Sequence, residues 1–271
     1  MPVIDLNGLQ CCAGMFKNCD VGQFEGFENF SSVVNASLMF YYARVRAAMP
    51  KLDTQNVQNA QGMFENARLT GGFGEKLDLR SVQNAKQMFK NCSSSNFPLG
   101  NEVNLPNAVD ASGMFQAMNV NQAGSLNKVV APRCANAGAM FSSANWLVNV
   151  KSVEIGENAD TSAGAAYGVG SMFMGCSRLE TVGNIAAPRT ASAWSMFLDC
   201  GALKRVGVVN MPRVVNMGQM FKNDGSLLNV CQFFVPSTAD GTDMFSGTQL
   251  GQRVYGKDGK ALFARMRLLG R

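Results

Sequence analysis

The stretch VQNAQGMFEN, residues 57–66, contains a Met-Phe pair that recurs along most of the chain, for example in VVNMGQMFKN, residues 214–223. Ten such pairs occur, at spacings of 24, 24, 25, 26, 26, 32, 24, 24 and 24 residues. A fixed period of this length indicates a repeat protein, because one short unit cannot bury its apolar face without stacked neighbours. The methionines of the ten pairs are Met15, Met39, Met63, Met88, Met114, Met140, Met172, Met196, Met220 and Met244.

Uncharged residues dominate the composition of these repeats. Charged residues make up 16% of the chain, well below the usual quarter. We therefore expect a surface of Asn, Ser, Gln, Gly and Thr side chains, which favours hydrogen-bonded contacts over ionic ones. The net charge of +5 lies in residues 253–271, where six basic side chains face Asp258 alone. The first 252 residues then hold 24 − 6 = 18 basic and 19 − 1 = 18 acidic side chains.

Several classes of function are excluded by the residues present. The chain has no histidine, which removes Ser-His and Cys-His nucleophilic machinery and histidine-containing metal sites. Carboxylates are scattered, and GVGSMF (168–173) lacks the third glycine of a dinucleotide-binding loop. We therefore predict a protein that is not an enzyme and that uses no cofactor or metal.

The sequence also gives expectations about location. No stretch approaches the roughly 18 apolar residues that a membrane span needs. The start, MPVIDLNGLQ, lacks a basic region followed by an apolar core, so we expect no secretory signal and synthesis in the cytosol. A virion or surface-associated location stays open.

Aligning the units on methionine reveals further columns. Alanine often stands three positions before the methionine, and Asn or Asp often stands four positions before it. The Asn/Asp column either caps a helix or bonds to the backbone of the neighbouring coil, and we expect it to be structural. Its members are Asn35, Asn59, Asn84, Asp110, Asn136, Asn216 and Asp240.

Each unit is expected to form a strand followed by a short helix or turn. Leu-x-x-Val recurs at 179–182, 203–206 and 227–230, and such apolar, β-branched stretches favour strands. The Met-Phe segment places apolar residues at helix-like offsets. The predicted fold is an α/β repeat solenoid of about ten coils, each about 24 residues long.

The regions outside the regular repeat suggest boundaries. Residues 1–250 are predicted to form the solenoid and residues 251–271 a basic C-terminal cap, since a solenoid needs a terminal unit that covers its last coil. Residues 1–10 run almost directly into the first repeat, which leaves an uncapped N-terminal coil open to self-association. The Gly/Ala/Ser-rich excess at 156–170 is predicted to be an extruded loop.

The units resemble those of the BspA-like leucine-rich-repeat family, in the variant whose repeats carry Met-Phe-x-x-Cys. The best matches are MFKNCD (15–20), MFKNCS (88–93), MFMGCSRL (172–179) and MFLDCGAL (196–203). The resemblance spans residues 1–250 and implies a leucine-rich-repeat-like solenoid, with a parallel strand on one face and short helical segments on the other. It also implies adhesion and protein binding on microbial surfaces.

The repeated residues themselves are expected to form the core. Ten equivalent Met-Phe pairs favour an internal stack of thioethers and rings. Alanine is the commonest substitute for cysteine three residues after phenylalanine, so that position favours a small apolar side chain. Cys231 is expected to pack beneath its strand. The other cysteines that we expect to be buried thiols rather than disulfides are Cys12, Cys19, Cys92, Cys134, Cys176 and Cys200.

Candidate contact residues lie where the units differ. Glu180, Thr181, Lys204, Arg205 and Asn229 fall between the inward Leu and Val positions and are predicted to face a protein or glycan partner. The alternative function is a structural subunit of a larger assembly, such as a virion or tail-associated receptor-binding protein.

Two basic features complete the candidate sites. Arg133, Arg189 and Arg213 follow prolines at equivalent positions and would align as a row at one corner, either solvated or facing an anionic partner. The basic tail at 251–271 is interpreted as a cap rather than as a nucleic-acid-binding segment.

Overall fold

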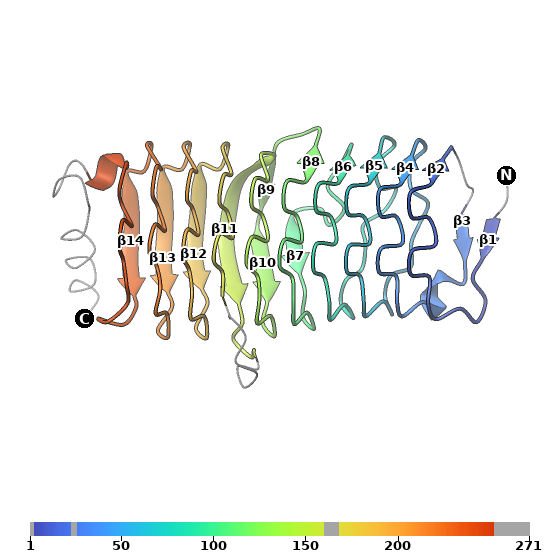
Figure 1. Ribbon diagram of the computed structural model, residues 1–271, viewed down its shortest axis with the longest axis horizontal. Helices are drawn as coiled ribbons and strands as arrows, with labels where there is room; N and C mark the ends of the chain where they lie inside the picture. Colours follow the sequence, from blue (N-terminus) through green and yellow to red (C-terminus); the bar gives the residue numbers. More distant parts are fainter. Residues whose placement is uncertain (1–2, 23–25, 160–167, 252–271) are drawn as a thin grey trace.

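The computed structural model is a parallel β-solenoid, and it describes residues 3–22, 26–159 and 168–251. The coils lie side by side along one long axis, with β1 near one end of the stack and β14 near the other (Figure 1). We number the coils 1 to 10 by their Met-Phe pairs. The predicted repeat solenoid is confirmed. The predicted cap at 251–271 lies outside the described residues except for Gly251.

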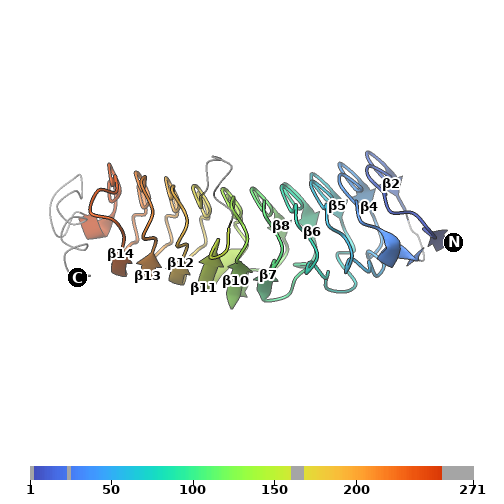
Figure 2. The same ribbon diagram turned by 90° about the horizontal axis from the view of Figure 1, so that it is seen from below.

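Three sheets run along the stack, and every strand pair in them is parallel. The strands of the long sheet follow one side of the stack, and narrow loops follow the opposite side (Figure 2). The long sheet contains β7 (Glu102–Asn104), β9 (Gly124–Leu126), β10 (Lys128–Ala131), β11 (Leu147–Ile155), β12 (Thr181–Ala186), β13 (Arg205–Asn210) and β14 (Asn229–Phe234). The second contains β2 (Asp20–Val21), β4 (Arg44–Val45), β5 (Arg68–Leu69), β6 (Ser93–Ser94) and β8 (Asn119–Val120), and the third pairs β1 (Val3–Asp5) with β3 (Gly26–Glu28).

The Leu-x-x-Val signal correctly predicts the long strands. Its valines form one in-register row across the sheet, Val150–Val182–Val206–Val230. Each of these valines is at most 2% exposed. The signal works because one face of the sheet is buried, which fixes the register of every strand.

The Asn/Asp column forms a further ladder along the stack. Each member makes an isolated parallel bridge with the equivalent residue of the next coil, for example Asn35 with Asn59. The side chain accepts a hydrogen bond within its own coil, as in Asn59, whose Oδ1 accepts the N–H of Gln61 at 3.2 Å. Neither predicted role holds as stated, because the side chain caps a turn instead of a helix and the bond to the neighbouring coil comes from the backbone instead of the side chain.

Two left-handed residues in every coil replace the predicted short helix. One stands immediately before the methionine and the other three residues after it, with φ between 51° and 76° in all ten coils. Because left-handed backbone costs an L-residue roughly 1–2 kcal/mol and breaks helical geometry, the segment is a series of turns. The helix prediction is therefore wrong for these segments, and the turn alternative holds. The helical residues within the described chain are η1 (Phe30–Ser32) and residues 249–251.

The left-handed residues direct backbone hydrogen bonds in two directions. The Met39 N–H donates to the Ala36 carbonyl of its own coil at 3.2 Å, while the Phe40 N–H donates to the Met63 carbonyl of the next coil at 2.8 Å. The Phe-to-Met bond repeats at 2.7–2.9 Å at every step from coil 1 to coil 10. These bonds tie neighbouring coils together without a continuous strand.

The ten phenylalanine rings of the pairs form one continuous stack. Successive ring centroids are 5.2–5.5 Å apart, and the ring planes differ by 2–15°. That spacing matches favourable offset stacking. In coils 2 to 10 both members of each pair are at most 1% exposed, so the predicted core role is confirmed. In coil 1, Met15 is 37% exposed.

The cysteines follow the prediction with exceptions. All eight are free thiols. Cys19 is partly exposed, and Cys231 is exposed on β14. The packed position predicted for Cys231 is wrong, because the inward positions of that strand belong to Val230 and Phe233. The cysteines that are buried as predicted are Cys12, Cys92, Cys134, Cys176 and Cys200.

Replacing Phe197 by alanine should lower the free energy of unfolding by roughly 3–5 kcal/mol, because it opens a cavity in the middle of the ring stack. Denaturant unfolding measures this change. The matched control is Phe234→Ala, because Phe234 is 42% exposed on β14 and its loss should change stability far less. Equal effects of the two substitutions would show that the rings are not a buried stack.

Ala139 precedes the methionine of coil 6 and has φ 54°. Ala139→Gly should raise the free energy of unfolding by up to about 1 kcal/mol, since glycine adopts this conformation without steric cost. Ala139→Val should destabilise the protein, because a β-branched residue is strongly disfavoured there. Urea midpoints in the opposite order would contradict the assigned backbone conformation.

Candidate binding surface

The outward face of strands β11 to β14 carries a row of polar side chains. Asn149, Thr181, Arg205 and Asn229 are in register on the four neighbouring strands. The Thr181 hydroxyl donates to Asn149 Oδ1 at 2.6 Å, and Asn149 Nδ2 donates to Ser125 Oγ at 3.2 Å. The structure therefore brings together Thr181, Arg205 and Asn229, which the sequence singled out as contact residues.

The other two candidate residues of this surface form an ion pair beside the row. Lys204 Nζ lies 2.9 Å from Glu180 Oε2, and the side chains are 49% and 45% exposed. An exposed pair of this kind contributes little to stability, so both groups stay accessible to a partner. We call Asn149, Thr181, Arg205, Asn229, Glu180 and Lys204 together the contact strip.

Two glycines let the strands beneath the contact strip approach closely. A Cβ atom at Gly183 would lie 1.9 Å from the carbonyl oxygen of Lys151, and one at Gly207 would lie 2.7 Å from Asn184 Oδ1. Asn184 Oδ1 also accepts the N–H of Val208 at 3.0 Å. The strip therefore rests on a tightly packed sheet, which holds its side chains at fixed spacing.

The predicted arginine row is less continuous than the sequence suggests. Arg189 and Arg213 occupy equivalent corner positions in neighbouring coils 8 and 9, whereas Arg133 lies in coil 6. All three side chains are exposed. The Arg133 guanidinium donates to Asn107 Oδ1 at 3.4 Å, so it also connects two coils.

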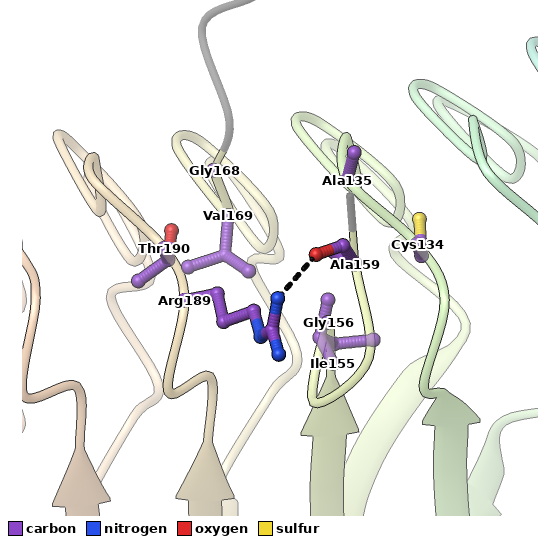
Figure 3. Close-up of a pocket in the computed structure, with 9 residues that line it drawn as sticks. All are labelled: Cys134, Ala135, Ile155, Gly156, Ala159, Gly168, Val169, Arg189 and Thr190. Carbon is purple, nitrogen blue, oxygen red and sulfur yellow. Dashed lines mark hydrogen bonds between the residues drawn. The ribbon is translucent and has the colours of Figure 1, made fainter. Parts of the chain in front are cut away.

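Arg189 is directed at the inserted loop. Its guanidinium donates to the carbonyl of Ala159 at 2.9 Å, across a small cavity that Cys134 and Val169 also line (Figure 3). Ala159 is the last described residue before the middle of the predicted 156–170 loop, of which residues 160–167 lie outside the described residues. Arg189 therefore fixes one end of this insertion, a role that the sequence did not indicate.

A buried carboxyl replaces cysteine in coil 9. Asp224 is fully buried, and its Oδ1 accepts the N–H of Cys200 at 2.8 Å, while its Oδ2 has no partner within the described structure. Burial, together with the nearby Asp199 carboxylate, raises the pKa of Asp224 to about 9 despite the hydrogen bond from the Cys200 N–H, which lowers it. The carboxyl is therefore protonated at neutral pH.

The buried thiols of Cys200 and Cys134 are poor nucleophiles. Burial, followed by the hydrogen bond to Cys176 and the charge of Asp224, raises the pKa of Cys200. Burial likewise raises the pKa of Cys134 to about 12. Because the thiolate is the reactive form, these groups act as small apolar residues that also donate hydrogen bonds, for example from Cys200 Sγ to the Phe173 carbonyl at 2.9 Å.

Two further searches concern metal ions and membranes. Within the described residues, no group of three or more Cys, Asp or Glu side chains is arranged to hold a metal ion. No helix in that same part of the chain is long and apolar enough to cross a membrane.

The buried Asp224 makes stability depend on pH. Its folded pKa of about 9 exceeds the unfolded value near 4, so the native state binds the proton more tightly and loses stability as pH rises between these values. Asp224→Asn, which stays neutral, should remove this loss. The wild type should lose on the order of 4 kcal/mol relative to the variant between pH 4 and pH 7.

Denaturant unfolding at several pH values tests this, with Glu157→Gln as the control at an exposed carboxyl that does not influence the pKa of Asp224. Parallel pH profiles for the wild type and Asp224→Asn would show that Asp224 is ionised in the native state.

Part of the chain is similar to a known protein family. Residues 10–128, which run from coil 1 through coil 5 to β10, match the model of a family described as Mycoplasma protein of unknown function, DUF285. No curated protein matches the chain, and no solved structure matches it.

Proposed function

We propose that this solenoid is a non-enzymatic binding module that recognises a protein or glycan partner through the contact strip. The observation that carries this proposal is the in-register row from Asn149 to Asn229 on four neighbouring strands. Amide, hydroxyl and guanidinium groups at fixed spacing suit a partner rich in hydrogen-bonding groups. Arginine in particular is enriched where interfaces derive their energy.

Two exposed apolar side chains extend this surface at β14. Leu228 is 45% exposed and Phe234 is 42% exposed, and they lie just before and at the end of the strand that carries Asn229. Apolar anchors beside polar groups are typical of protein-binding surfaces. Both lie at β14, the terminal strand of the long sheet within the described residues, so a partner seated on the strip meets them at that end.

The resemblance to BspA-like repeats supports an adhesive role. Four units carry Met-Phe-x-x-Cys, and the Met-Phe pair recurs at spacings of 24 to 32 residues along the stack. The proposed function is therefore adhesion, with the coils serving as a rigid support for the strip.

Binding to a glycan array and to a panel of immobilised extracellular glycoproteins tests this function. Selective retention on at least one member is expected, and Arg205→Glu should weaken that binding roughly tenfold or more. Lys86→Glu changes the same charge on the Asn-ladder side of the stack and is the matched control. Retention on no member, or equal loss with both variants, would contradict the proposal.

A structural subunit of a larger assembly is the second candidate. Met15 of coil 1 is 37% exposed, whereas the methionines of the pairs in coils 2 to 10 are at most 1% exposed. An apolar side chain that is buried in every other coil and open here favours association. Light scattering across a concentration series distinguishes the two: a stable monomer at all concentrations argues against the assembly, and a defined oligomer supports it.

A further inference from the structure

Beyond the strand ends, the ladder of the long sheet continues through one further backbone hydrogen bond, which coils 2 to 4 do not make within the described residues. The bond runs from the N–H nine residues before the methionine to a carbonyl of the next coil. Examples are Leu105 N–H to Val130 O at 2.8 Å, Ala187 N–H to Asn210 O at 3.0 Å and Met211 N–H to Phe234 O at 3.0 Å. In coil 4 the equivalent donor is Leu79 and the equivalent acceptor is Asn104. Within the described residues these two groups do not form that bond.

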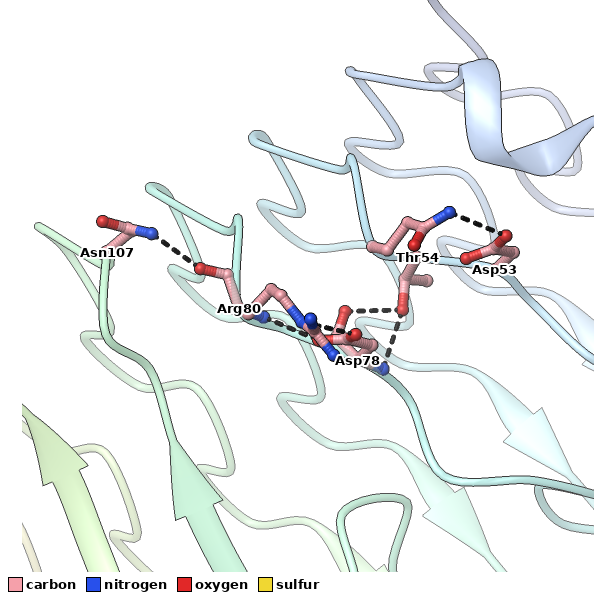
Figure 4. Close-up of polar contacts among 6 residues, drawn as sticks. Asp53, Thr54, Asp78, Arg80 and Asn107 are labelled. Carbon is pink, nitrogen blue, oxygen red and sulfur yellow. Dashed lines mark hydrogen bonds and ion pairs between the residues drawn. The ribbon is translucent and has the colours of Figure 1, made fainter.

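A threonine explains why the peptide groups of Asp78 turn toward coil 3 instead of coil 5. On either side of them coil 4 stays bonded to coil 5, through Leu77 N–H to the Pro98 carbonyl at 3.1 Å and Asn107 Nδ2 to the Arg80 carbonyl at 2.8 Å. Thr54 of coil 3 is 1% exposed, and its hydroxyl donates to the Asp78 carbonyl at 2.7 Å and accepts the Asp78 N–H at 3.0 Å (Figure 4). The peptide groups on both sides of Asp78 are therefore held toward coil 3. Asp78 also holds Arg80 through a 2.8 Å ion pair.

Among the residues that the structure describes, strand β7 consequently has one unpaired edge. It pairs with β10 and is the last strand of the long sheet. The Asn101 carbonyl and the Leu105 N–H bond toward β10. Because peptide groups alternate in direction along a strand, the N–H and C=O groups of Glu102 and Asn104 point the other way, toward coil 4.

A groove lies at this edge. It has a volume of about 500 Å³ and is lined by residues 76–80 of coil 4 and by Asn101, Glu102 and Asn104 of coil 5. That volume is in the range of ligand-binding sites. Leu77 and Leu79 line the groove but are only 8% and 3% exposed, so it presents mainly polar and charged groups, among them Lys76, Arg80 and Glu102.

The chemistry of the groove fits an extended peptide. Unpaired backbone donors and acceptors at a strand edge are complemented by another strand. Lys76 and Glu102 are exposed on opposite walls and offer one charge of each sign to the side chains of that strand. Charged side chains also protect edges from unwanted pairing, and coil 4, which faces this edge across the groove, leaves the edge open only to a chain that enters the groove.

We propose that the groove between coils 4 and 5 binds an extended peptide segment of a partner protein, which adds as a strand to the free edge of β7. The site is separate from the contact strip and does not depend on the function proposed for it.

Amide hydrogen exchange tests the premise on the unbound protein. The N–H groups of Glu102 and Asn104 should exchange rapidly, whereas those of Val103 and Leu105 should be protected by bonds to β10. Equal protection of the four amides would show that the edge of β7 is already paired, which would overturn the proposal.

Selection from a phage-displayed library of random peptides, each about ten residues long, tests the binding. Enriched peptides should protect the Glu102 and Asn104 amides from exchange. Glu102→Pro should abolish their binding, because proline removes the N–H that faces the groove and is tolerated at the first residue of a strand. Glu102→Gln keeps that N–H and should bind the same peptides with little change.

A second measurement covers the case in which Glu102→Pro fails to fold. A synthetic copy of the best peptide with N-methyl groups on alternate residues should lose its affinity for the wild-type protein, while its unmethylated form binds. Failure to enrich any peptide that protects β7, or equal binding of the methylated copy, would overturn the proposal.

Discussion

The structure depends on one backbone arrangement, the hydrogen bond from the phenylalanine N–H of each coil to the methionine carbonyl of the next. This bond forms because a left-handed residue precedes each methionine and another follows three positions later. Together the two left-handed residues orient alternate peptide groups along the stack axis, where they bond to the next coil. In a helix, each of these groups would bond within its own coil. The bond holds neighbouring coils at a separation that lets the rings stack at 5.2–5.5 Å. Backbone and ring stack therefore support each other, and the rest of each coil is free to vary.

Much of this architecture is predictable from the sequence. The Met-Phe period reveals the repeat, and Leu-x-x-Val reveals the long strands, because burial of one sheet face fixes which residues are apolar. The helix prediction fails because period alone does not distinguish a helix from a tight turn that also buries every third or fourth residue. The missed signal is composition: the column three residues after methionine is rich in Asn, Asp and Gly, the residues that adopt left-handed backbone most readily.

The candidate site was only partly predictable. In-register strands place Thr181, Arg205 and Asn229 in one row, so spacing alone finds them. Asp224 stands at a position held by cysteine in other coils, but its protonation depends on burial, which the sequence does not show. The groove beside β7 depends on Thr54, whose hydroxyl takes the place of a backbone hydrogen bond between coils 3 and 4. No column of the repeat predicts that contact, since it arises where two irregular coils meet.

Scalar couplings measured by NMR across hydrogen bonds test the central claim most directly. The account predicts that the Phe40 amide nitrogen couples to the carbonyl carbon of Met63 in the next coil, and that the equivalent coupling recurs in later coils. Coupling of the Phe40 nitrogen to the carbonyl four residues earlier in its own coil, Ala36, would show an α-helix. That result would contradict the left-handed turns on which the stacked coils depend.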